Sequence, residues 1–321
     1  MRTSRSLVSR PRVPRHAGVL LTLVAIAALS AGCEGQDDED GALADGLLVL
    51  SGSIAEMRLR VFEDGEPGGR NLALPDPATT WVAAGRTNVL VATTVDGRTF
   101  VSGPLGDEDP EWRLVEPVTA ADAPPEPPLY FGTWDPPGGA YAQLGTDFTE
   151  GGGVRVVVVD PALEGASEAA LNQTRAQPVP PAWVDDDRVA VVTGLPDAPE
   201  TVIVDTPSGG TSPGPDGALL LATSADAAVT AAWDGPGRPI SVLPTAAWLD
   251  GQTGAIRIDA PEAGWTPGAL ALDGPGRRLA ILWVDDGTAA GVTVHAGDRD
   301  WSRVATITVS DVQAASIGWL R

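Results

Sequence analysis

Residues 79–118, TTWVAAGRTNVLVATTVDGRTFVSGPLGDEDPEWRLVEPV, decide the fold. They hold four short runs of apolar or β-branched residues, TTWVAAG, NVLVATTVDG, RTFVSG and WRLVEPV. Such residues fit a pleated strand, and the glycines and aspartates between the runs favour hairpin turns. The segment therefore predicts one small sheet of four antiparallel strands.

The same kind of segment recurs along the chain. Small residues stand beside a Trp in TTWVAAG (79–85), FGTWDPPG (131–138), PAWVDDD (181–187) and SIGWLR (316–321), while GALLLATSAD (217–226) and GALALDGPG (268–276) look like the same element without the Trp. The mean step is about 48 residues, and a period of that length with four strands is typical of β-propeller blades. The repeat therefore predicts an all-β propeller.

The period divides residues 46–321 into six blades. Five are continuous, at 79–118, 129–178, 181–216, 217–262 and 268–310. The sixth is split: its outer strands are 46–52, 56–65 and 70–75, and its innermost strand is SIGWLR at 316–321. We expect six four-stranded blades, closed by pairing of the N- and C-terminal strands, with a seven-bladed ring as the alternative. Closure removes the exposed sheet edges of an open array.

The small residues and the indoles have a joint physical role in this fold. Innermost strands crowd around the axis, so Gly, Ala and Ser allow their backbones to approach, and Trp rings fill the widening space between blades. We therefore expect the ten Trp to pack in the core. Helix is expected only as a short turn within LEGASEAALNQ, residues 163–173.

Two propeller families resemble this chain. TTW…DGRTF…W and PAWVDDDRVAVV look like blades of TolB-type six-bladed propellers, and SGPLGDEDPEW (102–112) and AGDRDW (296–301) resemble degenerate Asp-box hairpins of sialidase-like propellers. The resemblance covers nearly all of 46–321. It implies architecture rather than a shared activity, because one fold hosts many functions.

The N-terminus resembles a bacterial lipoprotein signal. Residues 1–16 carry five Arg and no acid, and residues 17–32, AGVLLTLVAIAALSAG, are uncharged. This apolar run is too short to span a bilayer comfortably, and it leads to Cys33, the only cysteine. The resemblance implies cleavage after residue 32 and lipidation of Cys33. Ser30 departs from the family pattern, which places Leu, Val or Ile there.

An acidic tether follows the predicted lipidation site. Residues 34–45, EGQDDEDGALAD, carry six acids and no base, so self-repulsion should extend them. We therefore expect 1–32 to be a signal peptide, 33–45 the lipidated cysteine with its tether, and 46–321 the propeller. The protein would be exported to the cell envelope, on the outer leaflet of a membrane or in the periplasm.

Charge and composition exclude several classes of function. The chain has a formal charge of −22 and no Lys among its 21 basic residues, so it does not bind nucleic acid through a basic face. Beyond the predicted signal, only one histidine, His295, is present, which excludes a histidine-pair zinc site and argues against a Ser-His-Asp site. A sialidase-like site would need a Tyr nucleophile, and only Tyr130 and Tyr141 are present.

Acidic residues recur at one position of the blade repeat. The turns between the second and third strands should emerge on one face, beside the loops between blades, and each carries a carboxylate. These candidates are Glu56, Asp96, Asp147, Glu150, Asp197, Glu200, Asp234, Asp285 and Asp286. Such a rim would focus negative potential and could hold Ca²⁺ or a basic partner, although turns favour Asp for backbone reasons alone.

These observations favour a monomeric, membrane-anchored propeller that acts as a non-catalytic scaffold for a protein or a ligand, with a protein or a cell-wall glycan as partner and no required cofactor. Two alternatives remain open at this point: a glycan-active hydrolase or lyase of sialidase-like architecture, and a calcium-dependent adhesion module.

Overall fold

The computed structural model describes residues 46–320, apart from 54–55, 64–67, 86–87, 107, 116–128, 138–139, 146–152, 161–164, 172–176, 178, 216, 255, 257 and 313. The predictions for residues 1–45, including Cys33, lie outside this part of the chain.

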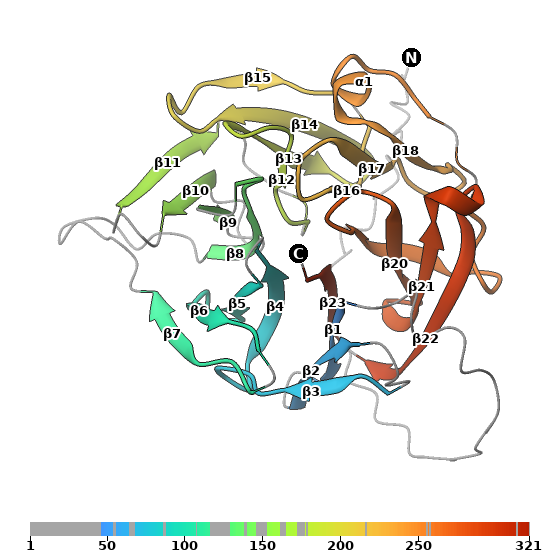
Figure 1. The fold of residues 1–321 in the computed structure, drawn as a ribbon. Coiled ribbons are helices and arrows are strands. Elements are labelled where there is room, and N and C mark those ends of the chain that lie inside the picture. The colour runs from blue at the N-terminus through green and yellow to red at the C-terminus, as the bar shows by residue number, and fades with distance from the viewer. Residues whose placement is uncertain are drawn as a thin grey trace, which may run out of the picture. The chain divides into compact units, whose positions relative to one another are not determined.

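Six antiparallel sheets surround one axis, which confirms the six-bladed β-propeller (Figure 1). Blade 1 is ordered β23-β1-β2-β3, and blades 2 to 6 are β4–β7, β8–β11, β12–β15, β16–β18 and β19–β22. The strand bounds are β1 Leu47–Ser53, β2 Glu56–Phe62, β3 Arg70–Leu72, β4 Thr79–Ala84, β5 Val89–Thr94, β6 Thr99–Pro104, β7 Trp112–Val115, β8 Leu129–Trp134, β9 Tyr141–Gly145, β10 Val154–Asp160, β11 Gly165–Leu171, β12 Ala182–Trp183, β13 Arg188–Leu195, β14 Ala198–Asp205, β15 Thr211–Pro213, β16 Leu220–Thr223, β17 Val229–Trp233, β18 Ile240–Pro244, β19 Thr266–Leu272, β20 Arg278–Asp285, β21 Thr288–Ala296, β22 Ser302–Val312 and β23 Ala314–Trp319.

The innermost strands form a closed circuit. In the order β23, β4, β8, β12, β16 and β19, each contacts the next, and β19 contacts β23 again. The segments that carry the small-residue repeat therefore occupy the axis, including the two repeats without Trp, which are β16 and β19. This arrangement is the one that the sequence period predicts.

The two chain termini close the ring within blade 1, as predicted. Strands β1 and β23 pair antiparallel, with Leu48 opposite Gly318 and Leu47 opposite Trp319. Beyond the strands, the Leu320 N–H donates to the Gly46 carbonyl at 2.7 Å. Because β1 is flanked by β23 and β2, the first strand of the chain is not an edge strand.

The core is divided into clusters that lie between blades. One joins blades 6 and 1 through Val292, Ile307 and Trp319, and another joins blades 1 and 2 through Leu59, Val82 and Leu90. Seven of the ten Trp are buried and the other three are half-buried, as the packing role predicts.

The expected helical turn at 163–173 is wrong. Residues Gly165–Leu171 form β11, which pairs along its whole length with β10, Val154–Asp160. Ala and Glu favour helix locally, but an isolated helix this short is marginal. Pairing with β10 gives these residues a full ladder of backbone hydrogen bonds, so the strand is more stable here than a short helix.

Blade 5 differs from the other five. It shows three strands in the part of 217–262 that the structure describes, and a short helix, α1 (Thr245–Leu249), follows β18. The helix packs against β17 and β18, and its Trp248 is buried with Val184 and Ile203 of blade 4. An indole from a helix thus fills space between blades that strand side chains fill elsewhere.

A single methyl group tests the close approach near the axis. A Cβ on Gly85 would lie 2.9 Å from the ring of Trp134, whereas one on Gly103 would meet nothing within 4 Å. We predict that Gly85→Ala lowers the free energy of unfolding by about 1–3 kcal/mol because of overpacking, and that Gly103→Ala does not lower it. Urea denaturation measures both, and equal effects would contradict this packing.

Candidate functional site

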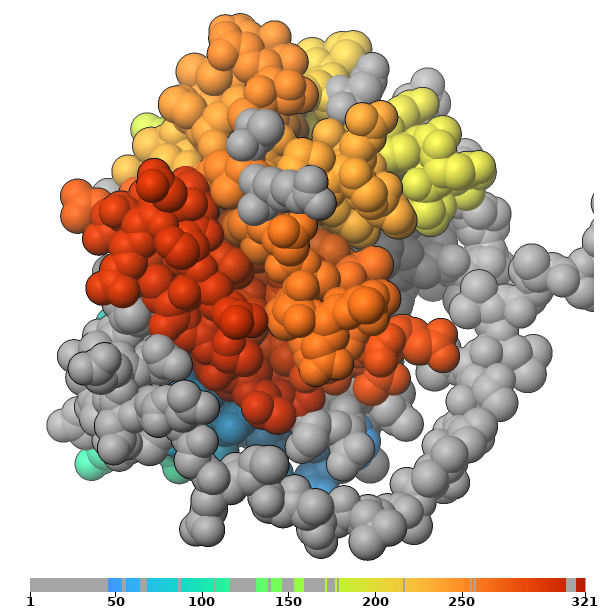
Figure 2. All heavy atoms as spheres, turned by 90° about the vertical axis from the view of Figure 1, so that its right-hand side faces the viewer, coloured from blue at the N-terminus to red at the C-terminus, as the bar shows by residue number. Residues whose placement is uncertain are grey.

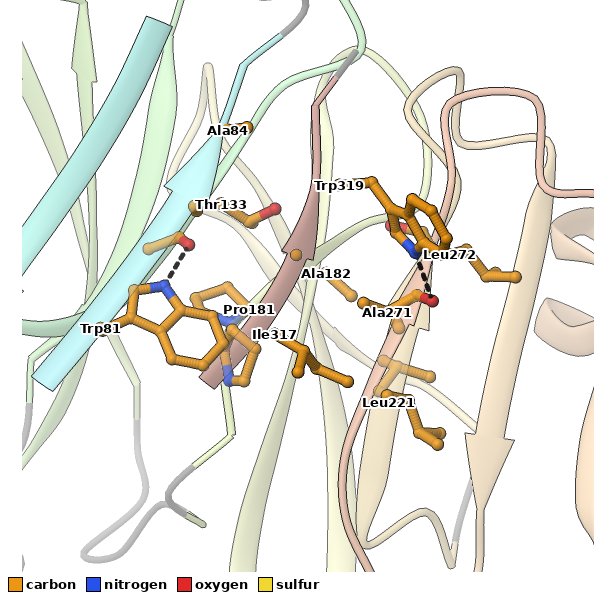
Figure 3. A pocket seen from close by; sticks show the side chains of 17 residues that line it. Trp81, Ala84, Thr133, Pro181, Ala182, Leu221, Ala271, Leu272, Ile317 and Trp319 are labelled. Atoms are coloured by element: carbon orange, nitrogen blue, oxygen red, sulfur yellow. Dashed lines mark hydrogen bonds between the residues drawn. The ribbon is translucent and has the colours of Figure 1, made fainter. Parts of the chain in front are cut away.

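The axis of the ring contains a narrow channel. It encloses about 70 Å³ and is lined by residues of, or adjoining, all six innermost strands. Figure 3 shows Trp81, Ala182, Ala271, Ile317 and Trp319 around it. Within the described residues, no Arg, His, Tyr or acid lines this channel. The channel has room for ordered water but not for a sugar ring held by charged groups.

Indole N–H groups connect neighbouring blades at this channel. Trp81 Nε1 donates to the Gly132 carbonyl at 3.0 Å, and Trp183 Nε1 donates to the Thr133 carbonyl at 3.1 Å. Both acceptors belong to β8, so blades 2 and 4 are bonded to blade 3. Each bond satisfies a donor that would otherwise be buried unpaired, at a cost of about 1–3 kcal/mol.

The third such bond closes the ring. Trp319 Nε1 donates to the Ala271 carbonyl of β19 at 3.1 Å, as Figure 3 shows. The Arg278 guanidinium lies 4.4 Å from the centre of the Trp319 ring, and its Nε donates to Asp273 at 2.9 Å. The cation–π contact therefore fastens blade 6 to the C-terminal strand, and the ion pair within blade 6 holds the arginine in position for that contact.

Sequence reasoning missed a repeated turn at the end of the innermost strands. Asp135 Oδ1 accepts the Ala140 N–H at 3.1 Å, and Asp273 Oδ1 accepts the Arg278 N–H at 3.0 Å. Ser224 Oγ accepts the Val229 N–H at 3.0 Å in the same way. The signal was present, since a short polar residue directly follows each of these three inner strands, β8, β16 and β19. These side chains therefore serve the fold by closing the first hairpin.

The topology places the acidic candidates as the blade repeat predicts, at or beside the turns between second and third strands. The described members are Glu56 at the start of β2, Asp96 after β5, Asp197 and Glu200 at the β13–β14 hairpin, Asp234 after β17, Asp285 at the end of β20 and Asp286 after it. Asp147 and Glu150 lie outside the described residues. Whether these acids act together as a binding rim stays a prediction.

Several of these acids have local structural roles. Asp96 accepts hydrogen bonds from Thr94 Oγ1 and from Arg98 Nε, the latter at 2.9 Å, and the Thr94 bond is the main cause of its lowered pKa. Burial raises the pKa of Asp234, although the nearby Arg238 opposes this shift. Where the chain is described, no three His, Cys, Asp or Glu side chains gather closely enough to hold a metal ion. Calcium binding therefore stays a prediction as well.

His295 is a buried residue of β21 whose two ring nitrogens both have partners. Nδ1 lies 3.0 Å from the Trp301 carbonyl, which can only accept, so Nδ1 carries the proton. Nε2 lies 2.9 Å from Thr293 Oγ1, which in turn accepts from Trp283 Nε1 at 2.7 Å. Burial is the main cause of its lowered pKa. The imidazole is thus a neutral element of the core, as a strand position suggests.

The two tyrosines considered for a sialidase-like site, Tyr130 and Tyr141, both lie in blade 3. Tyr141 is completely buried with Val91, Val101 and Trp134, and burial raises its pKa above the ordinary value. It faces the interior between blades 2 and 3 and is not presented to a ligand. Tyr130 belongs to β8.

Comparisons with known proteins bear on the fold. No protein-family model and no curated protein matches the sequence. Among solved structures, TolB from Acinetobacter baumannii superposes with a TM-score of 0.57 at 11% identity, over 85% of this chain and 66% of that one. This chain thus spans just under two thirds of that TolB.

Two further structures are similar at this level. A putative TolB from Agrobacterium tumefaciens gives a TM-score of 0.51 at 13% identity, covering 86% of this chain and 98% of that one. A chain of a nidogen/laminin complex gives 0.56 at 12% identity, covering 85% and 98%. Identities this low show a shared propeller fold and nothing finer. None of the helices in the described ranges is long and apolar enough to cross a membrane.

The buried imidazole predicts a pH dependence of stability. The pKa of His295 is lower in the folded chain than the ordinary value of 6.5, so the unfolded chain takes up the proton first as the pH falls. Its stabilisation is present above about pH 6.5 and is lost during acidification below that value. We predict that His295→Gln, which cannot titrate, loses less stability between pH 7 and pH 5 than the natural chain. Urea denaturation at several pH values measures both free energies of unfolding. An equal loss of stability in the two proteins between pH 7 and pH 5 would contradict the buried neutral imidazole.

Proposed function

We propose that this protein is an exported, lipid-anchored β-propeller that acts as a non-catalytic binding scaffold in the cell envelope. The observation that carries the proposal is the narrow axial channel, whose described lining has no Arg, His, Tyr, Asp or Glu side chain. Enzymatic propeller sites need converging charged or nucleophilic groups, and here the inner strands supply backbone and indole contacts that hold the blades together.

Rigidity supports a scaffold role. The three indole bonds between inner strands and the pairing of β1 with β23 hold the blades in one closed ring. A rigid ring presents its turns at fixed positions, and loops on a rigid framework are common binding elements. The charge of −22 would favour a basic partner and repel an anionic membrane surface, so attachment would depend on the lipid.

Anchoring is inferred from the N-terminal sequence. The basic residues of 1–16, the uncharged run 17–32 and Cys33 together support processing as a lipoprotein. Attachment by more than one acyl chain gives stable membrane binding, whereas a single chain gives only marginal binding. The acidic residues 34–45 would hold the propeller away from the bilayer.

Mutation of the cysteine tests the anchor. We predict that Cys33→Ser moves the protein from the membrane fraction to the soluble fraction and abolishes labelling by a clickable fatty acid. Ser30→Leu, which restores the family pattern, should leave both readouts as in the natural chain. A Cys33→Ser protein that stays in the membrane fraction would contradict the lipid anchor.

The scaffold role is tested by crosslinking in the natural envelope, followed by capture of the anchored chain. We expect a defined partner to be recovered with the folded protein and lost with a Gly85→Ala variant that is heated through its unfolding transition before the crosslinker is added. Hydrolysis of a cell-wall glycan or sialoside by the purified protein would instead favour the enzyme.

A further inference from the structure

A second cavity lies between blades 5 and 6 and is much larger than the axial channel. It encloses about 470 Å³, which is within the usual size of small-molecule sites. Its walls come from residues 236–240 around the turn between β17 and β18, from residues 258–260, and from Trp265 to Pro267 at the start of β19. We call it the interblade pocket.

The pocket lies near the face of the ring that carries the turns between second and third strands. Trp233 ends β17 and Trp283 lies near the end of β20, and both indoles line the pocket. Ile258 and Ala260 pack on the cluster that contains these two indoles. Figure 2 shows this side of the molecule, where the orange segment before β19 lies against the red strands of blade 6.

The floor of the pocket is apolar and held in place by blade 6. Trp233 and Trp283 are buried and Trp265 is half-buried, and three proline rings complete the walls. The Trp265 ring lies over β21, because a Cβ on Gly291 would be 3.7 Å from its Cζ3 atom. A ligand that enters must therefore present mainly apolar surface.

The pocket offers two indole N–H groups to a ligand. Trp283 Nε1 is already bonded to Thr293 Oγ1 at 2.7 Å. Where the chain is described, Trp233 Nε1 and Trp265 Nε1 make no hydrogen bond, and neither atom is fully enclosed. Trp233 is only 8% exposed and lines the pocket, so its N–H reaches the outside through this cavity. Indoles buried to this degree usually have a hydrogen-bond partner, and here that partner must come from a ligand or from water.

The two charged residues of the lining already have neighbours in the protein. Arg238 acts electrostatically on Asp234, and Asp259 takes part in an interaction of its own. The other polar side chain of the lining is Thr266, whose hydroxyl can donate as well as accept. The side-chain groups left for a ligand are therefore hydrogen-bond donors on an apolar floor.

We propose that the interblade pocket binds a proline-rich peptide segment in the polyproline II conformation. Its rings would lie on the indole floor, and its backbone carbonyls would accept from Trp233 Nε1 and Trp265 Nε1. Proline has no backbone N–H, so the segment brings no donor that this donor-lined pocket would leave unpaired. Aromatic grooves are suited to such segments because the polyproline II helix is already formed before binding.

This inference rests on the proposed binding function and names the chemical class of its partner. The two can fail separately. Failure of proline peptides to bind would overturn the pocket, whereas a partner captured by crosslinking in the envelope would still support the scaffold.

Calorimetry on the purified full-length protein tests the proposal with peptides that are capped at both ends. We expect acetyl-hexaproline-amide to bind. A capped peptide of alternating Pro and Ala should bind about fivefold more weakly, because its added N–H groups lack partners in the pocket. Absence of binding by acetyl-hexaproline-amide, or equal binding by the alternating peptide, would overturn the proposal without any variant of the protein.

Variants assign the donor. Trp265→Phe keeps an apolar ring and removes the N–H, so it should weaken acetyl-hexaproline-amide about fivefold, as the loss of one hydrogen bond predicts. Trp301→Phe is the matched control, because this half-buried indole packs on the same cluster but does not line the pocket. Its binding should be unchanged. Equal affinities of the two variants would count against donation by Trp265, and urea denaturation checks that both remain folded.

Discussion

The pairing of β1 with β23 is the constraint on which the rest of the structure depends. Blade 1 is complete only when the last strand of the chain joins the first strands, and here Leu47 and Leu48 lie opposite Trp319 and Gly318. Without that ladder, β1 would become an edge and the C-terminal strand would lose its backbone partners. Closure also brings Trp319 against blade 6, where its ring donates a hydrogen bond to the Ala271 carbonyl and stacks against the Arg278 guanidinium.

The indoles turn this closed ring into a stiff one. A buried Trp removes about 150–250 Å² from water, which stabilises the fold by roughly 4–6 kcal/mol at 25 cal/mol per Å² before entropy is counted. In Trp81, Trp183 and Trp319 the same ring also donates to a carbonyl of the neighbouring blade. The axis thereby serves stability. Its described lining has no charged side chain, which leaves binding to the faces of the ring and to the seams between blades.

Much of this fold could be predicted from the sequence because the repeat is local. Runs of β-branched residues and Gly turns mark each blade. The first blade has no inner strand of its own at the start of the chain, and SIGWLR at the end of the chain matches the missing strand. Residues 165–171 were misjudged because GASEAAL has helix-forming residues, and only the edge of β10 decides its conformation. The role of Trp248 could not be read either, since nothing local indicates that a helix fills an interblade gap.

The binding features were predictable only in part. Strand order alone predicts that the turns between second and third strands lie on one face, so the positions of their acids could be predicted. Position does not decide whether these acids bind a ligand together. The cavity between blades 5 and 6 could not be foreseen, because Trp233, Arg238, Asp259 and Trp265 are brought together by the docking of two blades. A seam of this kind has no sequence period.

Engineered cysteines measure the closure of the ring most directly. Val49 and Ile317 lie opposite each other across β1 and β23, and directly opposed Cβ atoms lie about 4.5–5.5 Å apart, near the range that a disulfide requires. In a Cys33→Ser background, the pair Val49→Cys and Ile317→Cys should oxidise readily in the folded protein and raise the urea midpoint. The pair Val49→Cys and Val191→Cys, which spans blades 1 and 4, should keep both thiols. Free thiols in the first pair would contradict a ring closed by its own termini.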